Sequence, residues 1–250
     1  MKNLDEGINL TVEWLRSKAR EGNARGLVVG VSGGVDSALV SFLIKKAFPD
    51  NSLGVILPCK SNSADREDAL KVVKAAGISY QEVTLTPVHD LLFNSIKNDL
   101  TTGATEASQL NLRLADANLR ARLRMSTLYC IANALNYLVV GTDNAPETYT
   151  GYFTKYGDGG VDLVPLSNLT KREVRAWAKH IGVPDEIVNR TPTAGLWENQ
   201  TDEGEMGTTY DMIDDFLEGK DIPAEDREII ERLHRISEHK RQLPPAPPKF

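Results

Sequence analysis

The sequence predicts an α/β protein with a Rossmann-like parallel sheet and helices on both faces. Short apolar runs alternate with segments of helical periodicity, which is typical of parallel strands joined by helices. A glycine-rich turn follows the first apolar run and opens a helical segment. There is no internal repeat and no linker between two halves, so we expect residues 1–250 to form a single domain.

Apolar runs predict the strands at residues 27–29, 53–58, 78–85 and 138–142, with a fifth short strand or an extended segment at 161–166. Helical spacing predicts helices at residues 1–22, 38–44, 63–76, 87–99 and 109–135. After Thr170 the chain is predicted to be mostly helical. It ends in a proline-rich extended tail at residues 243–250, because proline does not fit a helix interior.

The composition excludes several functional classes. Hydrophobic residues make up 41% and charged residues 26%, as in ordinary globular proteins. The formal net charge of −6 argues against a nucleic-acid partner. No apolar run approaches the ~20 residues of a membrane span, and the first residues include acids rather than an apolar signal region. We therefore expect a cytoplasmic protein without membrane contact, in which Cys59 and Cys130 are buried, reduced thiols.

The turn after the first strand is the main candidate for a ligand site. Glycines bring the backbone close to a ligand, and the start of a helix offers free N–H groups to a phosphate. No lysine of a Walker loop is present, and an acid, Asp36, stands there instead. An acid beside phosphates is reasonable where Mg²⁺ bridges the two. The alternative is an ordinary tight turn. The residues are Gly30, Val31, Ser32, Gly33, Gly34, Val35, Asp36 and Ser37.

A second candidate segment follows the strand at 138–142. Thr142 lies just past this strand, so a parallel sheet brings it to the same crevice as the glycine turn. Pro146 disfavours regular structure before Glu147, which places that carboxylate in a loop. Glu147 is then either a second metal ligand beside Asp36 or an incidental surface acid.

Residues 151–162 combine glycines, aromatic residues and charges. They form either an ordinary turn or a substrate loop. In the second case the aromatic faces would contact a ring and Lys155 a negative group. Asp158 or Asp162 would contact an amine or a hydroxyl.

The helix at 109–135 carries four arginines. At about 100° per residue, Arg113, Arg120 and Arg124 share one face, which we expect to be solvated. Arg122 points toward the apolar side and therefore needs a carboxylate or a ligand phosphate as its partner.

Three later features complete the candidates. Lys171 lies in the first turn of a helix, where a cation is unfavourable, which hints at nearby phosphates. Residues 190–207 form a long irregular stretch containing Trp197, and we expect a mobile lid there. The cluster at 239–241 is a charged helix end or part of a site.

These motifs resemble those of a known family. Ser32–Ser37 is similar to the pyrophosphate loop of the ATP pyrophosphatases, which split ATP between its α and β phosphates. More specifically, residues 121–125, 141–147, 151–160 and 196–203 resemble ammonia-type NAD synthetases, and the resemblance covers nearly the whole chain. The chain departs from the usual family pattern at Pro146 and at Asn199.

The resemblance implies an adenine nucleotide alpha hydrolase-like fold and ATP-dependent amidation of deamido-NAD with ammonia. The products would be NAD, AMP and pyrophosphate, formed through an adenylated intermediate. It also implies a homodimer with the dinucleotide at the interface. No glutaminase-like segment is present, so ammonia would be free unless a separate protein delivers it. The implied roles are ATP binding by residues 30–37, Thr142, Lys171 and Thr193; Mg²⁺ binding by Asp36 and Glu147; deamido-NAD binding by Arg122, Lys155, Asp162, His239 and Lys240; and ammonium binding with general-base action by Asp158.

Two other functions stay open at this point. One is another ATP pyrophosphatase, such as a tRNA-modifying enzyme, which the acidic net charge disfavours. The other is a nucleotide-binding module without catalysis, which would bind ATP but release no pyrophosphate when deamido-NAD and ammonium are supplied.

Overall fold

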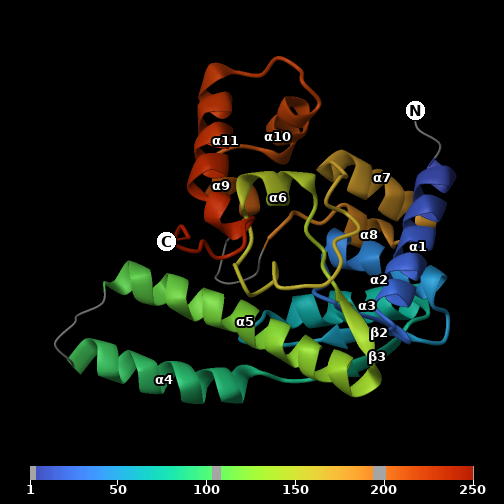
Figure 1. Ribbon diagram of the computed structural model, residues 1–250, viewed down its shortest axis with the longest axis horizontal. Helices are drawn as coiled ribbons and strands as arrows, with labels where there is room; N and C mark the ends of the chain where they lie inside the picture. The colour runs from blue at the N-terminus through green and yellow to red at the C-terminus, as the bar shows by residue number, and fades with distance from the viewer. Residues whose placement is uncertain (1–3, 103–107, 194–200, 250) are drawn as a thin grey trace.

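The computed structural model describes residues 4–102, 108–193 and 201–249 (Figure 1). A four-stranded parallel sheet forms its centre, in the order β3-β2-β1-β4. The strands are β1 (Gly26–Gly30), β2 (Ser52–Ile56), β3 (Ser79–Glu82) and β4 (Tyr137–Val140).

Helices connect and follow the strands, and the predicted helix at 109–135 has the bounds of α5. The helices in the described ranges are α1 (Leu4–Glu21), α2 (Val35–Ala47), α3 (Ser63–Ala76), α4 (Thr86–Thr102), α5 (Gln109–Leu135), α6 (Ala145–Thr150), α7 (Lys171–Ile181), α8 (Asp185–Val188), α9 (Asp202–Met206), α10 (Tyr210–Leu217), α11 (Ala224–Ile236) and the 3₁₀ turn η1 (Glu238–Lys240).

Alternate residues of the inner strands β1, β2 and β4 enter two different hydrophobic cores. Leu27 and Val29 of β1 pack with residues of α1, α2, α7 and α8. Val28 between them packs on the other face, against Leu128 and Ala132 of α5. This is the period-two alternation of a strand with both faces buried. The predicted fold class, a parallel sheet with helices on both faces, is confirmed.

The expected third strand is shorter than predicted, and no fifth strand forms in the described part of the chain. The third, β3, covers only Ser79–Glu82 at the sheet edge, where its side chains are exposed. Of the two alternatives for 161–166, the structure shows an extended segment. It touches the sheet through an isolated bridge between Val140 and Leu163.

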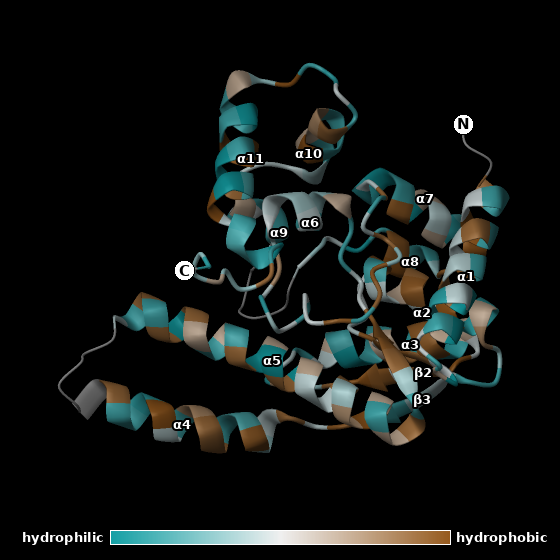
Figure 2. Cartoon of the chain, in the orientation of Figure 1, coloured by the Kyte–Doolittle hydropathy of each residue, from teal (hydrophilic) through white to brown (hydrophobic). Residues whose placement is uncertain are grey.

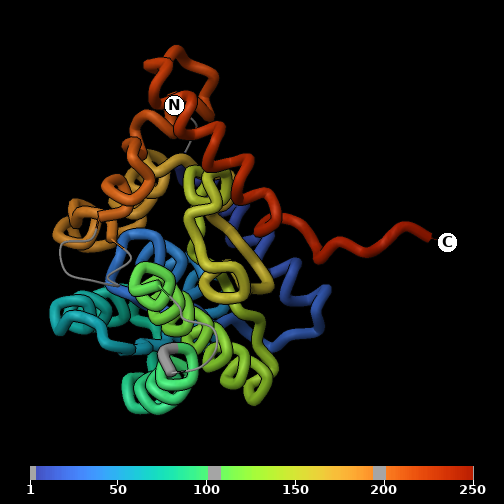
Figure 3. The backbone as a smooth tube through the Cα atoms, turned by 90° about the vertical axis from the view of Figure 1, so that its left-hand side faces the viewer, coloured from blue at the N-terminus to red at the C-terminus, as the bar shows by residue number. Residues whose placement is uncertain are grey.

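Two parts project from this body. Helices α4 and α5 form a long hairpin on one side, and α10 and α11 rise on another (Figure 1 and Figure 2). The last described residues leave the body as an extended tail (Figure 3). In the described part of the chain, no helix combines the length and apolarity needed to cross a membrane.

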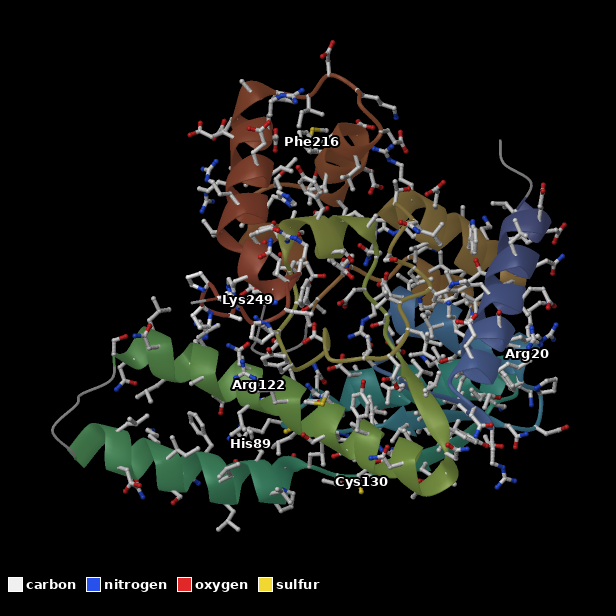
Figure 4. All side chains as sticks on the ribbon, in the orientation of Figure 1. Arg20, His89, Arg122, Cys130, Phe216 and Lys249 are labelled. Atoms are coloured by element: carbon white, nitrogen blue, oxygen red, sulfur yellow. The ribbon has the colours of Figure 1, made fainter. Side chains whose placement is uncertain are left out.

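The two cysteines differ in their surroundings. Cys59 is buried, but Cys130 is exposed, so the expectation of two buried thiols is wrong for Cys130. Cys130 lies on α5 (Figure 4), toward the end of the helix, where several neighbouring positions are exposed.

Candidate active site

A cavity of about 480 Å³ lies at the carboxyl ends of β1, β2 and β4. Because all the strands are parallel, the segments that follow them meet at this edge. The predicted site residues that line it are Gly30, Val31, Ser32, Gly34, Val35, Asp36, Ser37, Thr142, Glu147, Asp158, Lys171, Thr193 and Lys240.

The glycine turn forms an open cradle at the start of α2. Gly33 has a φ of +84°, and a Cβ there would lie 2.8 Å from the backbone oxygen of Asp65, so only glycine fits. The Ser32 and Ser37 hydroxyls lie 3.1 Å apart across the turn. No side chain caps the N-terminus of α2, so its first N–H groups stay available to an anion.

Lys171 lies between the two predicted metal ligands. Its ammonium donates to Asp36 Oδ2 at 2.7 Å and to Glu147 Oε1 at 3.1 Å, and the residue is only 2% exposed. Burial by itself lowers the pKa of Lys171, but the two carboxylates outweigh it and hold the pKa above its usual value. Residues separated by more than a hundred positions therefore form one compact charged cluster.

Glu147 is held on a helix and not in a loop, so the expectation drawn from Pro146 is wrong. Proline is accepted in the first turn of a helix, where its missing N–H is not needed, and α6 begins at Ala145. Asn144 caps this helix and completes a capping box, in which its backbone N–H donates to Glu147 Oε2 at 3.1 Å. Asn144 Nδ2 also donates to Asp36 Oδ1 at 2.9 Å and so joins the two carboxylates.

Asp36 and Glu147 fit a magnesium ion. The described ranges contain no cluster of three or more His, Cys, Asp or Glu side chains placed to hold a metal. Mg²⁺, however, is usually bound by one or two carboxylates together with substrate phosphates and water. Two carboxylates that contact one ammonium beside the uncapped start of α2 match this donor set.

Asp143 is a cavity residue that sequence reasoning missed. It is buried between Thr142 and Asn144, and burial, with Asp158, Glu147 and Asp36 adding to it, raises its pKa well above the usual value. Four carboxyl groups therefore lie close together at the cavity, and their mutual repulsion opposes the ionisation of Asp143.

The loop at 151–160 brings Asp158 and Lys240 to the cavity. The backbone N–H of Thr154 donates to Asp158, and the enclosing protein raises the pKa of this carboxyl although it stays open to the cavity. Lys240 donates to the carbonyl oxygens of Gly151 and Phe153, at 2.7 Å each. The 3₁₀ turn near the C-terminal end of the described chain is thereby fixed to this loop.

The other four predicted dinucleotide contacts lie outside the cavity lining. Three of them, Arg122, Lys155 and His239, are neighbours. Arg122 donates to the carbonyl oxygen of Lys155 at 3.4 Å, and the ammonium of Lys155 donates to the carbonyl oxygen of His239. Asp162 instead accepts from the Tyr129 hydroxyl at 2.9 Å and from the backbone N–H of Val139 at 2.8 Å.

The predicted arrangement of the arginines on α5 is confirmed for Arg113, which is exposed, and wrong for the other three. Arg120, expected in solvent, has a side chain that is only 11% exposed and pairs with Asp116. Arg122, labelled in Figure 4, is exposed.

Arg124, expected in solvent, lines the cavity, where it donates to the carbonyl of Leu57 and to Ser61 Oγ, both at 3.1 Å. The helical wheel failed because α5 buries one side on the sheet and turns another to the cavity. A polar side chain facing a cavity looks the same in sequence as one facing solvent.

The expected lid falls only partly within the described residues. Arg190 pairs with Asp65 and Asp68 of α3, and residues 202–206 form α9 and are not irregular. Trp197 and Asn199 lie outside the described ranges.

Fold and site together define a parallel α/β protein of the nucleotide-binding class, with a glycine turn after its first strand and an uncapped helix start at the cavity. The chain matches the family model described as NAD synthase over residues 7–244 and belongs to that family.

Individual relatives agree in length and in fold. A protein of Alkaliphilus oremlandii (strain OhILAs) named NH(3)-dependent NAD(+) synthetase is 57% identical over 246 residues, 98% of either chain. The structure of NMN synthetase from Francisella tularensis has a TM-score of 0.91 at 38% identity and covers 99% of either chain. NAD+ synthetase from Burkholderia pseudomallei has a TM-score of 0.79 at 30% identity, covering 98% of this chain and 92% of that one.

Proposed function

We propose that this chain catalyses ATP-dependent amidation of deamido-NAD with ammonia, giving NAD, AMP and pyrophosphate. The observation that carries the proposal is the Asp36–Lys171–Glu147 cluster beside the open start of α2, in a chain of the NAD synthase family. A carboxylate is a poor acyl donor, and transfer of an adenylyl group to it supplies a leaving group. This chemistry needs positioning and charge neutralisation more than a protein nucleophile.

In this proposal the ATP phosphates bind in the cradle of residues 30–37. N–H groups at the start of α2 and the Ser32 and Ser37 hydroxyls face this space, with Thr142 and Thr193 on the same cavity wall. Asp36 and Glu147 would hold Mg²⁺, which supplies neutralisation of the phosphate charge when bound. Lys171, freed from its carboxylates, would reach a phosphate oxygen.

The first step joins a nicotinate carboxylate oxygen to the α-phosphorus, and pyrophosphate leaves. In the second step the nitrogen of ammonia bonds to the carbonyl carbon, and the bond to AMP breaks. Asp158 is placed to bind ammonium and to accept its proton, because its carboxylate opens on the cavity and its raised pKa favours taking up a proton.

The dinucleotide contacts are proposed to be completed by a second copy of the chain. Lys240 lines the cavity, whereas Arg122, Lys155, Asp162 and His239 lie outside its lining. The α4–α5 hairpin exposes an apolar surface, and a homodimer would bury it. Its residues are Val88, Leu91, Leu92 and Ile96 on α4 and Leu110 and Leu114 on α5.

A cytoplasmic location is also proposed. In the described chain Cys59 and Cys130 are both free thiols, as expected in a reducing compartment.

A second acceptor is nicotinate mononucleotide. The solved structure named NMN synthetase has a higher TM-score, 0.91, than the NAD+ synthetase structure at 0.79. The same amidation on the shorter acid would give the mononucleotide product.

The test supplies ATP, Mg²⁺ and ammonium with either deamido-NAD or nicotinate mononucleotide. We expect NAD and AMP in equal amounts, with a higher kcat/KM for deamido-NAD. A higher kcat/KM for nicotinate mononucleotide would make that acid the main substrate in place of deamido-NAD. If the protein binds ATP but forms no AMP with either deamido-NAD or nicotinate mononucleotide, it is a nucleotide-binding module without this activity.

A further inference from the structure

Tyr210, the first residue of α10, touches the centre of the site although it belongs to no recognised motif. Its hydroxyl lies 2.8 Å from Glu147 Oε1, and the residue is only 2% exposed. The other oxygen of Glu147 accepts from the backbone of Asn144. The carboxylate is therefore held at both oxygens, on one side by its own helix and on the other by Tyr210.

The ring of Tyr210 contacts the second charged group of the cluster. The Lys171 ammonium lies 4.5 Å from the ring centroid, within the range of a cation–π contact. One turn further along α10, the fully buried Asp214 accepts from the backbone N–H groups of Lys171 and Arg172, at 2.9 and 3.0 Å. One face of α10 thus fixes both the backbone and the side chain of Lys171.

Asp202 holds the tyrosine in turn. Its Oδ2 lies 2.9 Å from the Tyr210 hydroxyl, and its Oδ1 lies 3.2 Å from the Tyr152 hydroxyl. Asp202 is itself buried. The hydroxyl of Tyr210 therefore lies between two carboxylates that are themselves anchored on α6 and α9.

We propose that Tyr210 is a positioning residue for the metal and phosphate site, with its hydroxyl orienting Glu147 and its ring orienting Lys171. Asp202 fixes the hydroxyl. This inference rests on the proposed function, because it takes Glu147 as a metal ligand. Groups that hydrogen-bond a metal ligand commonly change metal affinity by 10- to 100-fold when removed.

The two roles are separated by two substitutions. Tyr210→Phe keeps the ring over Lys171 and removes only the hydroxyl, whereas Tyr210→Leu removes both. Tyr137→Phe is the matched control, because it also removes a tyrosine hydroxyl, one that donates to Asn51 at the opposite end of the sheet.

The experiment measures Mn²⁺ binding by the protein with ATP present and without any acid acceptor, as the loss of the free Mn²⁺ electron paramagnetic resonance signal beyond that caused by the same concentration of ATP alone. ATP binding without metal is measured by calorimetry. We expect Tyr210→Phe to weaken Mn²⁺ binding about tenfold and to leave metal-free ATP binding unchanged. Tyr210→Leu should weaken both, and Tyr137→Phe neither.

Wild-type Mn²⁺ affinity in Tyr210→Phe would overturn the proposal, and so would an equal loss in Tyr137→Phe. If Tyr210→Phe does not fold, Asp202→Asn decides the question: weaker Mn²⁺ binding supports the proposal, and unchanged binding overturns it. These binding measurements contain no acid acceptor and therefore do not depend on turnover. If the wild-type chain forms no NAD in the separate assay with deamido-NAD, that result contradicts the proposed function without deciding the role of Tyr210.

Discussion

The two halves of the candidate site differ in how completely one chain builds them. At the cradle, Asp36, Glu147 and Lys171 are buried or nearly so, and each has more than one hydrogen-bond partner. At the proposed dinucleotide half, Arg122 is exposed and its contact with Lys155 is a long one of 3.4 Å. The comparison indicates that the ATP half is preorganised within one chain, whereas the order of the dinucleotide half depends on bound ligand or on a second copy of the chain.

Asp36→Asn should have the largest effect. It removes one of the two proposed metal carboxylates while keeping a side chain of the same size. We expect kcat/KM to fall about 10³-fold, since the charge that stabilises the reacting phosphate is lost. Circular dichroism should show an unchanged fold. Wild-type turnover at ordinary Mg²⁺ concentrations would remove the metal assignment.

Leu91→Glu sharpens the comparison at the level of the assembly. Leu91 is 78% exposed on α4, so a charge there costs the single chain little. In a dimer interface it would be buried and unpaired. We expect sedimentation to show a monomer that binds ATP normally but has a KM for deamido-NAD at least about tenfold higher, a loss of ~1.4 kcal/mol. A fully active monomer would rule out a shared site.

Arg122→Ala should separate the two substrates. Loss of a cation that contacts only the dinucleotide should raise the KM for deamido-NAD about tenfold, which corresponds to one charge-assisted hydrogen bond. The KM for ATP should not change. Steady-state kinetics with each substrate varied in turn checks this. An equal rise in both KM values would place Arg122 in the ATP half.

Asp143→Asn should have the smallest effect, on stability and its pH dependence. The raised pKa of Asp143 means that the folded chain resists its ionisation. Below the usual Asp pKa the carboxyl of Asp143 is neutral in both the folded and the unfolded chain, so it does not reduce the free energy of unfolding. Stability is then lost as the pH rises from that value through the raised folded pKa. The variant should therefore melt about 2–4 °C higher than the wild type at pH 8, and the gain should shrink toward pH 4. A pH-independent difference would contradict this.

The sequence predicts local features of this protein better than distant ones. The strand, turn and helix around Ser32–Ser37 follow from glycine and apolar periodicity, and the structure matches them. Glu147 was placed wrongly because the same Pro146 that disfavours helix in the preceding residue is accepted in the first turn. Arg122 and Arg124 were exchanged because periodicity does not distinguish a cavity-facing side from a solvent-facing one.

Tyr210 could not be found from the sequence at all, and Asp202 lies in the family-like segment 196–203 without any sequence signal for its contact with Tyr210. Tyr210 lies 63 positions from Glu147 and has no characteristic spacing to it, so only the packing of α10 against α6 and α7 brings the two together. Lys171 is a partial exception. A cation in the first turn of a helix is a local misfit, which predicts nearby phosphates. In the structure the anions around Lys171 are the carboxylates of Asp36 and Glu147, and phosphate contact stays a prediction.

The most direct test follows the oxygen of the acid. Deamido-NAD labelled with ¹⁸O in its nicotinate carboxylate is incubated with the enzyme, ATP, Mg²⁺ and ammonium, and the AMP is examined by mass spectrometry. Amidation through an adenylate predicts one ¹⁸O in the phosphate of each AMP, because the carboxylate oxygen stays on phosphorus when ammonia displaces it. NAD formation with unlabelled AMP would contradict the account.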